Sequence, residues 1–358
     1  MKNIKTYFKH ILFYILIKLF SKNKSDSKIY LNNKSRILLI ILRNKSESLL
    51  ITPLIKLISN TTNAEISVIV NEDNEIIFAN NSFVSEIFLI ENKITSQFLQ
   101  IKNLRKFNFD IIINSNENYN EAEIIYSALI KSKFKIGFNN VYNKIFSHLI
   151  PKLNPVTNHF VDRILNICES FEFEIDKSNL NLFYQPSNIS YEDVDRFLLA
   201  VFNSNKLYVI LNISDEIHNN FWGIDNYKKL IRFIKNYDVN IIITSLQKDI
   251  DYADKISDGK EKIFFSDDFD KFAALISRSN FIFTLDNFTL QLASAFKIPV
   301  FCLFGKTTNN ELIRVPYISD FDFIRSDEND LSDLHYGKVL NSFIPYFDFV
   351  FENFQLNK

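Results

Sequence analysis

The residues best placed to do chemistry lie in residues 280–305, which read NFIFTLDNFTLQLASAFKIPVFCLFG. A hydrophobic run leads into Asp286, a segment with helical spacing follows, and a second hydrophobic run closes the stretch. This order predicts a strand, a loop, a helix and another strand. In an open parallel sheet such a loop lies at the carboxyl ends of the strands, where the free N–H groups of the next helix point toward a bound ligand. We therefore expect a phosphate-bearing ligand at this loop.

Other catalytic and metal-binding patterns are missing from the sequence. The five histidines show no metal-ligand spacing, and no Gly-x-Ser-x-Gly, Walker or Gly-x-Gly-x-x-Gly pattern occurs. Hydrolase, kinase and dehydrogenase classes are therefore disfavoured. His159 stands where a helix is predicted to begin, which favours a structural role. Cys168 and Cys302 lie far apart in apolar patterns, which is typical of buried thiols in a reducing compartment.

Alternating strand-like and helix-like segments must position the loop residues. In the first half of the chain the strand-like runs are residues 36–42, 64–70, 84–90, 109–114 and 134–138. Segments with helical spacing separate them, at residues 47–59, 97–105, 121–131 and 159–171. This alternation predicts a doubly wound parallel sheet.

The pattern restarts after residues 174–191, a polar stretch without strong periodicity that we interpret as the domain boundary. Strand-like runs at residues 206–212, 240–245 and 262–266 alternate with helical runs at residues 226–235 and 269–279. The sequence thus predicts an α/β fold with two Rossmann-like domains that face a cleft. We place them at residues 29–180 and 181–335. Residues 336–358 are predicted to form one or two helices, interrupted at Pro345, that pack back toward the first domain.

Composition and charge narrow the partners. The chain has 358 residues, 47% of them hydrophobic, which is enough for two domains of ~150 residues with buried cores. Its 41 lysines and arginines nearly balance 42 aspartates and glutamates. With a net charge of -1 the whole chain has no attraction to nucleic acid, which we do not expect as a partner.

The first 28 residues differ from this average, since they contain seven lysines and a single acid, Asp26. Their uninterrupted apolar run, residues 11–17, is far shorter than the ~20 residues that span a bilayer, and no cleavage pattern follows it. We expect residues 1–28 to form an interfacial helix attracted to anionic lipids. The alternative is a frayed helix that packs on the first domain.

The segments, in their order, resemble glycosyltransferase family 9, the heptosyltransferases that build the lipopolysaccharide core. The matching pieces extend from Arg36 to about Asp320, and include RILLIIL, ESLLITPLIKLI, AEISVIV, KFKIGF, HFVDRIL, FAALISRSNFIFTLD and LASAFKIPVFCLFG. The resemblance implies the GT-B arrangement of two Rossmann-like domains. A lysine-rich hydrophobic N-terminal helix is also common in that family, which implies a cytoplasmic protein peripheral to the cytoplasmic face of the inner membrane.

The resemblance also implies a reaction. A heptose moves from an ADP-linked donor to a hydroxyl of a lipid-linked or lipopolysaccharide-core acceptor, with inversion at the anomeric carbon. Inversion needs a carboxylate that takes the acceptor proton, and the departing diphosphate needs positive charge or N–H donors. A GT-B fold supplies these without a metal, so the resemblance implies no cofactor beyond the nucleotide sugar.

The base of the family is an Asp in a Gly-Asp pair just after the first strand, and the aligned pair here is Ser46-Glu47. Glu47 is therefore the expected base, although its extra methylene displaces the oxygens by a distance that can cost ~100-fold in rate. The alternative is an acid in the first turn of a helix, which caps N–H groups or favours the dipole. The nearby Arg43 and Lys45 are expected to meet an anionic acceptor.

The donor motif of the family, Asp-Thr/Ser-Gly-x-x-His, keeps only its Asp. The aligned residues, which we assign to donor binding, are Asp286, Asn287, Phe288, Thr289 and, after Leu290, Gln291. A phosphate approaches closely over the family's glycine, whereas Phe288 brings a ring into that space. Gln291 hydrogen-bonds but lacks the charge available to His. The alternative for Asp286 is a helix N-cap.

The loop after Asn212 departs from the family as well. The family has Asn-Pro-Gly and then Lys-Arg-Trp, where this chain has Asn212-Ile213-Ser214 and Asn220-Phe221-Trp222. We assign Asn212, Ser214 and Asn220 to the diphosphate, although Asn220 replaces a lysine and so loses charge-assisted contacts. Lys306, after the last strand of the motif, restores a cation unless it is simply an exposed loop lysine. Trp222 keeps its place, or belongs to the core.

These losses leave two alternatives to a heptosyltransferase. The first is a catalytically degenerate GT-B protein that acts as a binding or scaffold subunit. The second is a transferase that has changed its donor.

Overall fold

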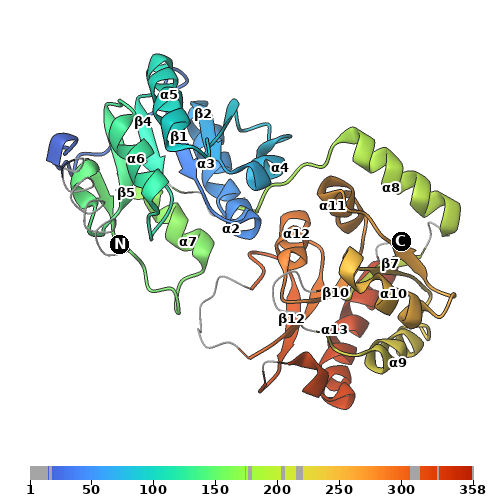
Figure 1. The fold of residues 1–358 in the computed structure, drawn as a ribbon. Helices are drawn as coiled ribbons and strands as arrows, with labels where there is room; N and C mark the ends of the chain where they lie inside the picture. Colours follow the sequence, from blue (N-terminus) through green and yellow to red (C-terminus); the bar gives the residue numbers. More distant parts are fainter. Residues whose placement is uncertain are drawn as a thin grey trace, which may run out of the picture. The chain divides into compact units, whose positions relative to one another are not determined.

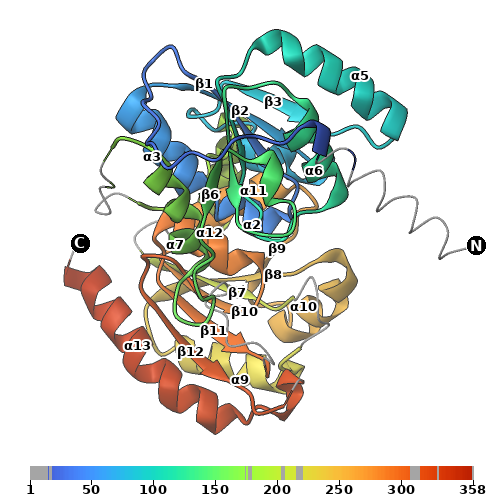
Figure 2. The same ribbon diagram turned by 90° about the vertical axis from the view of Figure 1, so that its left-hand side faces the viewer.

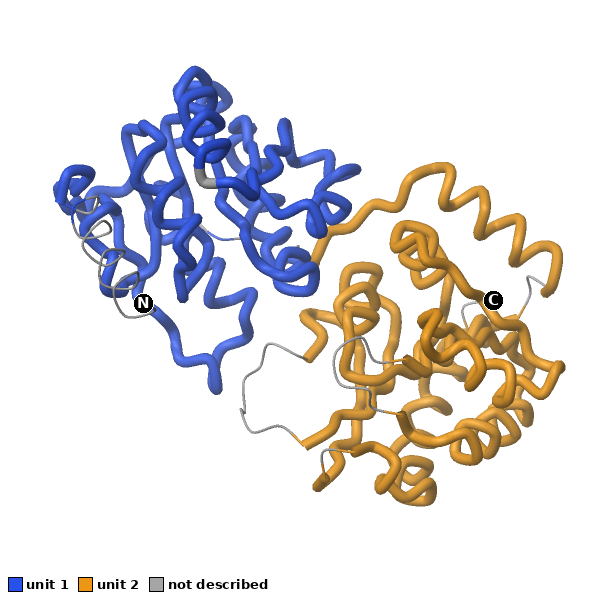
Figure 3. Tube along the Cα trace, viewed as in Figure 1, with its two compact units in different colours: residues 1–180 blue, residues 181–358 orange. Residues whose placement is uncertain are grey.

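Two compact units make up the chain, Met1–Leu180 and Asn181–Lys358 (Figure 3). The computed structural model describes residues 15, 18–173, 175, 180–202, 206–214, 221–306, 315–328 and 330–356. The predicted site residue Asn220 and most of the predicted N-terminal helix lie outside these ranges. Each unit contains a six-stranded sheet in which neighbouring strands are parallel, as predicted (Figure 1).

The first sheet has the order β3-β2-β1-β4-β5-β6. Its strands are β1 (Arg36–Ile41), β2 (Glu65–Val70), β3 (Glu86–Leu89), β4 (Ile111–Asn114), β5 (Phe134–Phe138) and β6 (His148–Ile150). β1, β2, β4 and β5 are almost entirely buried because helices cover both faces of the sheet, which explains their continuous apolar runs.

Helices of the first unit divide between the two faces of the sheet. They are α2 (Lys45–Leu49), α3 (Thr52–Thr62), α4 (Glu75–Phe78), α5 (Ile94–Leu104), α6 (Glu121–Leu129) and α7 (Phe160–Leu165). α5 and α6 share one core with alternate residues of β1 and β4, whereas α3 packs against α7. The helix predicted at residues 47–59 is two helices, because Pro53 at the start of α3 fits the first turn of a new helix better than the interior of one.

Within the predicted N-terminal helix, the described residues 15, 18 and 19 are helical, whereas residues 21–28 are not. The Nζ atom of Lys22 donates to the carbonyl of Ser132 at 2.9 Å, and that of Lys24 donates to the carbonyl of Phe146 at 2.9 Å. These backbone acceptors hold the segment in an irregular path along the first unit. Among the described residues, no helix is long and apolar enough to cross a membrane.

The second sheet repeats the topology of the first, with the order β12-β11-β10-β7-β8-β9. Its strands are β7 (Leu207–Asn212), β8 (Val239–Thr244), β9 (Lys262–Phe264), β10 (Phe281–Leu285), β11 (Val300–Phe304) and β12 (Phe321–Arg325). Counted from the first strand of each unit, both sheets have the order 3-2-1-4-5-6 of a Rossmann sheet. In both, the order reverses between the first and the fourth strand.

Helices cover the second sheet on both faces. They are α8 (Asn188–Val201), α9 (Ile224–Ile234), α10 (Ile250–Ser257), α11 (Phe269–Ser277), α12 (Phe288–Phe296) and α13 (Tyr336–Leu356). α9, α10 and α13 share the core formed by the odd-numbered residues of β7, β10 and β11. α11 packs against α8 and α12.

The C-terminal segment corrects one prediction, the interruption at Pro345. It is one helix, α13, which continues through Pro345 and packs on the sheet of its own unit (Figure 2). The cause is an aromatic stripe with helical spacing. The rings of Phe343 and Phe347 lie 5.8 and 5.0 Å from that of Phe281, within the range of favourable edge-to-face packing. This packing holds the helix together across the hydrogen bond that proline cannot donate.

Several helix ends take the left-handed conformation without glycine. α3 ends at Asn63 with φ 54°, α10 at Asp258 with φ 52°, and α12 at Lys297 with φ 57°. Glycine is the residue most suited to this position because it has no Cβ. The whole chain contains only five glycines.

Candidate active site

The point where the strand order reverses marks the candidate site in each unit, because open α/β sheets bind ligands there, outside the carboxyl ends of the strands. In the first unit β1 and β4 are the two neighbours at this point, with Ile40 beside Asn114. The residues that follow, Arg43 and Ser115, therefore leave the sheet side by side. Each unit is described by itself below.

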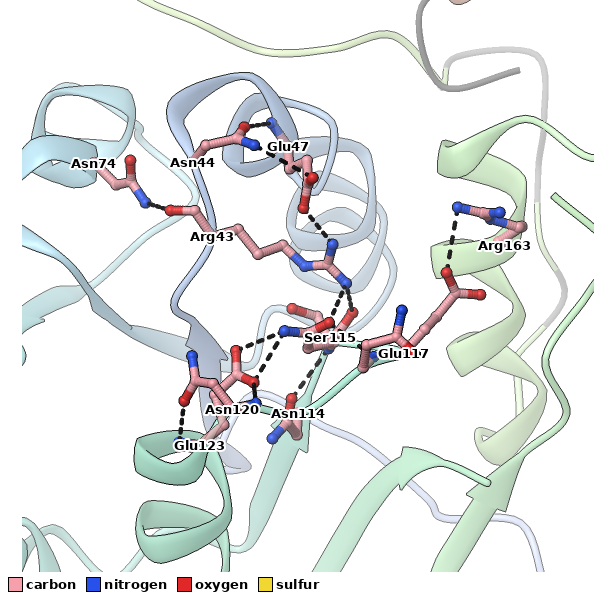
Figure 4. Close-up of polar contacts among 12 residues, drawn as sticks. Arg43, Asn44, Glu47, Asn74, Asn114, Ser115, Glu117, Asn120, Glu123 and Arg163 are labelled. Atoms are coloured by element: carbon pink, nitrogen blue, oxygen red, sulfur yellow. Dashed lines mark hydrogen bonds and ion pairs between the residues drawn. The ribbon is translucent and has the colours of Figure 1, made fainter. Parts of the chain in front are cut away.

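Arg43 links the loops that follow β1 and β4 (Figure 4). One terminal nitrogen donates to the carbonyl of Ser115 and to Oδ1 of Asn116, both at 3.0 Å, and the other donates to the carboxylate of Glu47. The guanidinium carbon lies 4.9 Å from the centroid of the Phe160 ring. With 7% of its side chain exposed, Arg43 is a fixed connector. The predicted role of Arg43 as an acceptor contact does not match this burial.

Glu47 lies in the first turn of α2, and 28% of its side chain is exposed. Asn44 is the N-cap of this helix, since its Oδ1 accepts the backbone N–H of Glu47 at 2.8 Å. The amide of Asn44 also donates to Oε1 of Glu47 at 3.3 Å, while Arg43 binds Oε2. The capping role that the sequence left open therefore belongs to Asn44, and the carboxylate of Glu47 is oriented at the edge of the site.

Glu123 is a second carboxyl of this site and is fully buried. Its Oε1 and Oε2 accept from the amide of Asn116 at 3.0 and 2.9 Å, and Oε2 also accepts the N–H of Asn120 at 2.8 Å. Asn120 and Glu123 form a capping box at the start of α6. Burial raises the pKa of the Glu123 carboxyl to about 7, against the opposing effect of these hydrogen bonds and of Arg43. Near neutral pH this group is therefore partly protonated.

A buried ion pair borders the site on the side of α7. Nη2 of Arg163 lies 3.2 Å from Oε2 of Glu117, with 6% and 13% of the two side chains exposed. The guanidinium of Arg163 also lies 5.4 Å from the centroid of Phe160, so this ring contacts the guanidinium groups of both Arg43 and Arg163.

In the second unit a buried polar network joins the corresponding strand ends. The amide of Asn212, at the end of β7, donates to Oγ1 of Thr284 at 3.0 Å and to Oγ1 of Thr289 at 3.1 Å. Oγ1 of Thr244, at the end of β8, donates to Oδ1 of Asn212 at 3.3 Å. β7, β8, β10 and α12 are thus fastened to one another under the loops.

Above this network, Ser214 connects three loops. Its carbonyl accepts from the amide of Asn287 at 2.6 Å, and its hydroxyl accepts the N–H of Leu246 at 2.9 Å. Oδ1 of Asn287 accepts the N–H of Thr289 at 2.9 Å, which makes Asn287 the N-cap of α12. The alternative that Asp286 is the N-cap is therefore wrong, because the helix begins one residue later.

Comparison with known proteins identifies the family of this chain. The family model of glycosyltransferase family 9 (heptosyltransferase) matches residues 99–344, which is more than half of the chain. The chain belongs to glycosyltransferase family 9. The resemblance drawn from the sequence is thereby confirmed.

A curated relative and several solved structures are similar to this family 9 chain. Lipopolysaccharide heptosyltransferase 3 of Escherichia coli (strain K12) is 24% identical over 222 residues, or 58% of this chain, and the chain spans about 62% of the length of that relative. The crystal structure of a family 9 glycosyl transferase from Veillonella parvula has a TM-score of 0.76 at 15% identity, covering 89% of this chain and 98% of that one. The E. coli heptosyltransferase WaaC with ADP has a TM-score of 0.68 at 14% identity, covering 87% and 99%. At these identities the solved structures establish a shared fold.

The family's donor positions have different surroundings from those predicted. The ring of Phe288 is buried and lies 5.0 Å from the ring of Phe269, so it points into the core. Gln291 is buried as well. Asp286 is half-buried and Lys306 is exposed, with its backbone N–H bound to the carbonyl of Glu328 at 3.0 Å.

Several side chains that the sequence marked with alternatives have structural roles. Trp222 is fully buried and its indole N–H donates to the carbonyl of Leu334 at 2.9 Å. Nδ1 of His159 accepts the N–H of Val161 at 3.1 Å as the N-cap of α7. Cys168 and Cys302 are buried free thiols, as expected. Lys45 is half-buried and takes part in an interaction within the protein. In the described ranges no group of three or more His, Cys, Asp or Glu side chains is arranged to hold a metal.

The sequence prediction missed the residues that support Arg43. Glu123 was predicted only as part of the helix at residues 121–131, and Ser115 and Asn116 were given no role. Their signal was the polar run SNEN directly after the buried strand β4, which neighbours β1.

Proposed function

We propose that this family 9 glycosyltransferase is an inverting heptosyltransferase that uses an ADP-linked donor and a lipopolysaccharide-core or related surface-glycan acceptor. The proposal rests on Glu47, a partly exposed carboxylate near the point where the strand order of the first sheet reverses. Arg43 binds one of its carboxylate oxygens and Asn44 binds the other, so both oxygens are oriented. A base must be held in reach of the proton that it takes. Glu47 is the carboxylate that combines this position with exposure, whereas Glu123 is fully buried.

In the proposed reaction Glu47 removes the proton of the acceptor hydroxyl. The hydroxyl oxygen then bonds to the anomeric carbon of the donor as the bond from that carbon to the diphosphate breaks. The electron pair leaves with the diphosphate as ADP. Because the attack comes from the face opposite the leaving group, the configuration at the anomeric carbon is inverted.

The second unit receives the donor in this proposal. The first turn of α12 presents N–H groups toward the loop after β10, where a diphosphate gains from the positive end of the helix dipole. Asn212, Asn287 and Thr289 act indirectly, because their side chains are used to fasten the loops. Asp286 and Lys306 remain candidates for direct contact, together with Asn220. No metal is required for this charge stabilisation.

The acceptor and the membrane are the proposed partners of the first unit. Arg43 orients Glu47 and does not meet the acceptor, whereas Lys45 keeps its proposed contact with an anionic acceptor. The basic residues 1–28 suggest that the enzyme works at the cytoplasmic face of the inner membrane, where a lipid-linked acceptor is available.

Calorimetric titration with ADP-heptose, ADP and other nucleoside diphosphates, followed by turnover assays, tests the proposal. Glu47→Gln should bind the donor with unchanged affinity and lose ~100-fold to 10,000-fold in turnover, the usual contribution of a general base. Glu75→Gln, which changes an acid in the first turn of α4, is the matched control and should retain turnover.

Each remaining outcome has a distinct meaning. Turnover of Glu47→Gln equal to that of the wild type removes Glu47 as the base. Donor binding without turnover in the wild type favours the binding or scaffold subunit, and binding of a different nucleotide sugar favours a changed donor. Absence of binding to every nucleotide sugar contradicts the catalytic proposal.

A further inference from the structure

One edge of the first unit gathers positive charge from three parts of the chain. The C-terminal ends of α5 and α6 lie together there, because Nε and Nη2 of Arg105 donate to the carbonyl of Leu129 at 2.9 and 2.7 Å. The N-terminal segment joins them, since Lys22 donates to the carbonyl of Ser132 and Phe20 packs against the core beneath α6. This is the amino-terminal edge of the sheet, because α5 and α6 run antiparallel to the strands.

The three segments contain many cations and no acid. Residues 18–25, 93–109 and 124–136 contain no Asp or Glu. We call their cationic surface the basic face, which consists of Lys18, Lys22, Lys102, Arg105, Lys106, Lys131 and Lys133. Five of these lysines, all except Lys22, are exposed.

The cations of the basic face are not neutralised by carboxylates. None of them takes part in a salt bridge within the described part of the chain. Lys22 and Arg105 use backbone carbonyls near the C-terminus of α6, where the helix dipole favours positive charge. Of the bordering acids, Glu65 is bound to the guanidinium of Arg36, and Asp110 accepts the backbone N–H of Arg36. The basic face therefore has a net positive charge.

Apolar side chains are exposed among these lysines. On α5, Phe98 is 51% and Leu99 62% exposed, and Lys102 lies one helical turn from both. In the N-terminal segment Leu19 is 73% exposed, next to Lys18. Figure 1 shows that α5 lies on the outside of the unit. Exposed aromatic and aliphatic residues flanked by lysines are typical of surfaces that enter the headgroup region of a bilayer.

We propose that the basic face binds the surface of an anionic bilayer, in addition to any contact made by residues 1–17. Only the role that we give to membrane binding, which is to bring the enzyme to a lipid-linked acceptor, rests on the proposed function. The charge favours anionic headgroups, and Phe98 and Leu99 favour a lipid interface over a purely ionic partner such as nucleic acid.

The position of the basic face has a geometric consequence. α6 begins at the capping box beside the candidate base and ends beside the basic face. Its nine residues span roughly 14 Å at 1.5 Å per residue. A bilayer bound at the basic face therefore leaves the carboxyl edge of the sheet in water, on the side where acceptor sugars project from the membrane.

Vesicle flotation with the full-length chain tests the proposal. The vesicles are phosphatidylcholine alone, or phosphatidylcholine mixed with phosphatidylglycerol. Lys102→Gln with Lys106→Gln keeps residues of similar helix propensity and should weaken binding to the mixed vesicles ~25-fold, at ~1 kcal/mol for each lysine. Lys255→Gln with Lys262→Gln removes two exposed lysines of the second unit and should leave binding unchanged.

Phe98→Ser with Leu99→Ser tests the apolar part, and should weaken binding to the mixed vesicles while Leu199→Ser, at a leucine of α8 that is 74% exposed, does not. Unchanged binding of both basic-face variants overturns the proposal, because residues 1–17 then account for all membrane contact. Equal binding of the wild type to neutral vesicles, or tighter binding to single-stranded RNA than to mixed vesicles, also overturns it. Calorimetry with the donor, run on the same samples, reports failure of the proposed function separately.

Discussion

Replacing Glu123 by Gln should remove a pH dependence that this buried carboxyl imposes on the stability of the first unit. Burial raises its pKa from 4.5 to about 7. Between these values the folded chain holds a proton that the unfolded chain has released, so the free energy of unfolding falls as the pH rises. The stabilising contribution is complete below about pH 4.5 and is lost as the pH rises through about 7.

The size of the effect follows from the same two values. A difference of roughly 2.5 pH units, at about 1.4 kcal/mol for each unit, corresponds to about 3.5 kcal/mol between the acidic and the alkaline limit. Gln at this position keeps the capping box, since its amide oxygen can accept and its amide group can donate. Asn116 must turn one donor away from the new amide, which shifts stability by an amount independent of pH. The informative quantity is therefore the change with pH, not the stability at one pH.

Hydrogen exchange of α6 and β4 amides measures this quantity for the first unit alone. These core amides exchange when the first unit unfolds, so they report the free energy of unfolding of that unit. At each pH the wild type and Glu123→Gln are compared under identical conditions, which cancels the chemical exchange rate. The difference between them should change by about 3 kcal/mol from about pH 4.5 to about pH 8. Glu121→Gln, an exposed acid of the same first turn, is the control and should follow the wild type. If Glu123→Gln also follows the wild type across this range, the reasoning from burial is refuted.

Three further predictions concern stability. Gly137→Ala should cost ~1–3 kcal/mol in the urea-induced unfolding of the first unit, because a Cβ would lie 2.5 Å from Oη of Tyr119 and 2.7 Å from the ring of Phe146; an unchanged midpoint would show that these rings move aside. Phe343→Ala should cost ~3–5 kcal/mol in the unfolding of the second unit and leave exchange in the first unit unaltered, and a loss in both units would contradict the packing of α13 on its own sheet. Burial lowers the pKa of Lys135 from 10.5 to about 7, so the unfolding free energy of the wild type should rise with pH between these values, and Lys135→Met should abolish this rise in urea titrations at neutral and alkaline pH.

The fold was largely predictable because both faces of each sheet are covered. Fully buried parallel strands read as continuous apolar runs, and β5 was predicted at its observed bounds, Phe134–Phe138. The short edge strands β6 and β12 were not predicted. β6 has only three residues and begins with His148, and β12, which is mostly unburied, carries the charged Asp322 and Arg325. Neither gives the continuous apolar run of a strand that is buried on both faces.

The candidate site was only partly predictable. Glu47 and Asn287 were assigned because they align with family motifs that come shortly after a strand, and position along the chain is enough to find such motifs. The partners of Arg43 follow β4, and they reach Arg43 only because β4 lies beside β1 in the sheet. Strand order is a property of the whole unit, so no local pattern reports it. The burial of the Phe288 ring likewise depends on Phe269, a residue of another helix.

The left-handed helix ends help to explain why Phe288 stands where the donor motif of the family has glycine. Lys297 and Asp258 hold conformations for which glycine is far better suited, which indicates that the chain has been depleted of glycine even where backbone geometry favours it. This depletion runs through the whole protein, consistent with a bias in its coding sequence. The absence of glycine at Phe288 is then one instance of a general drift in composition. It carries little weight as evidence against catalysis, and the Phe288 ring packs in the core against Phe269 of α11.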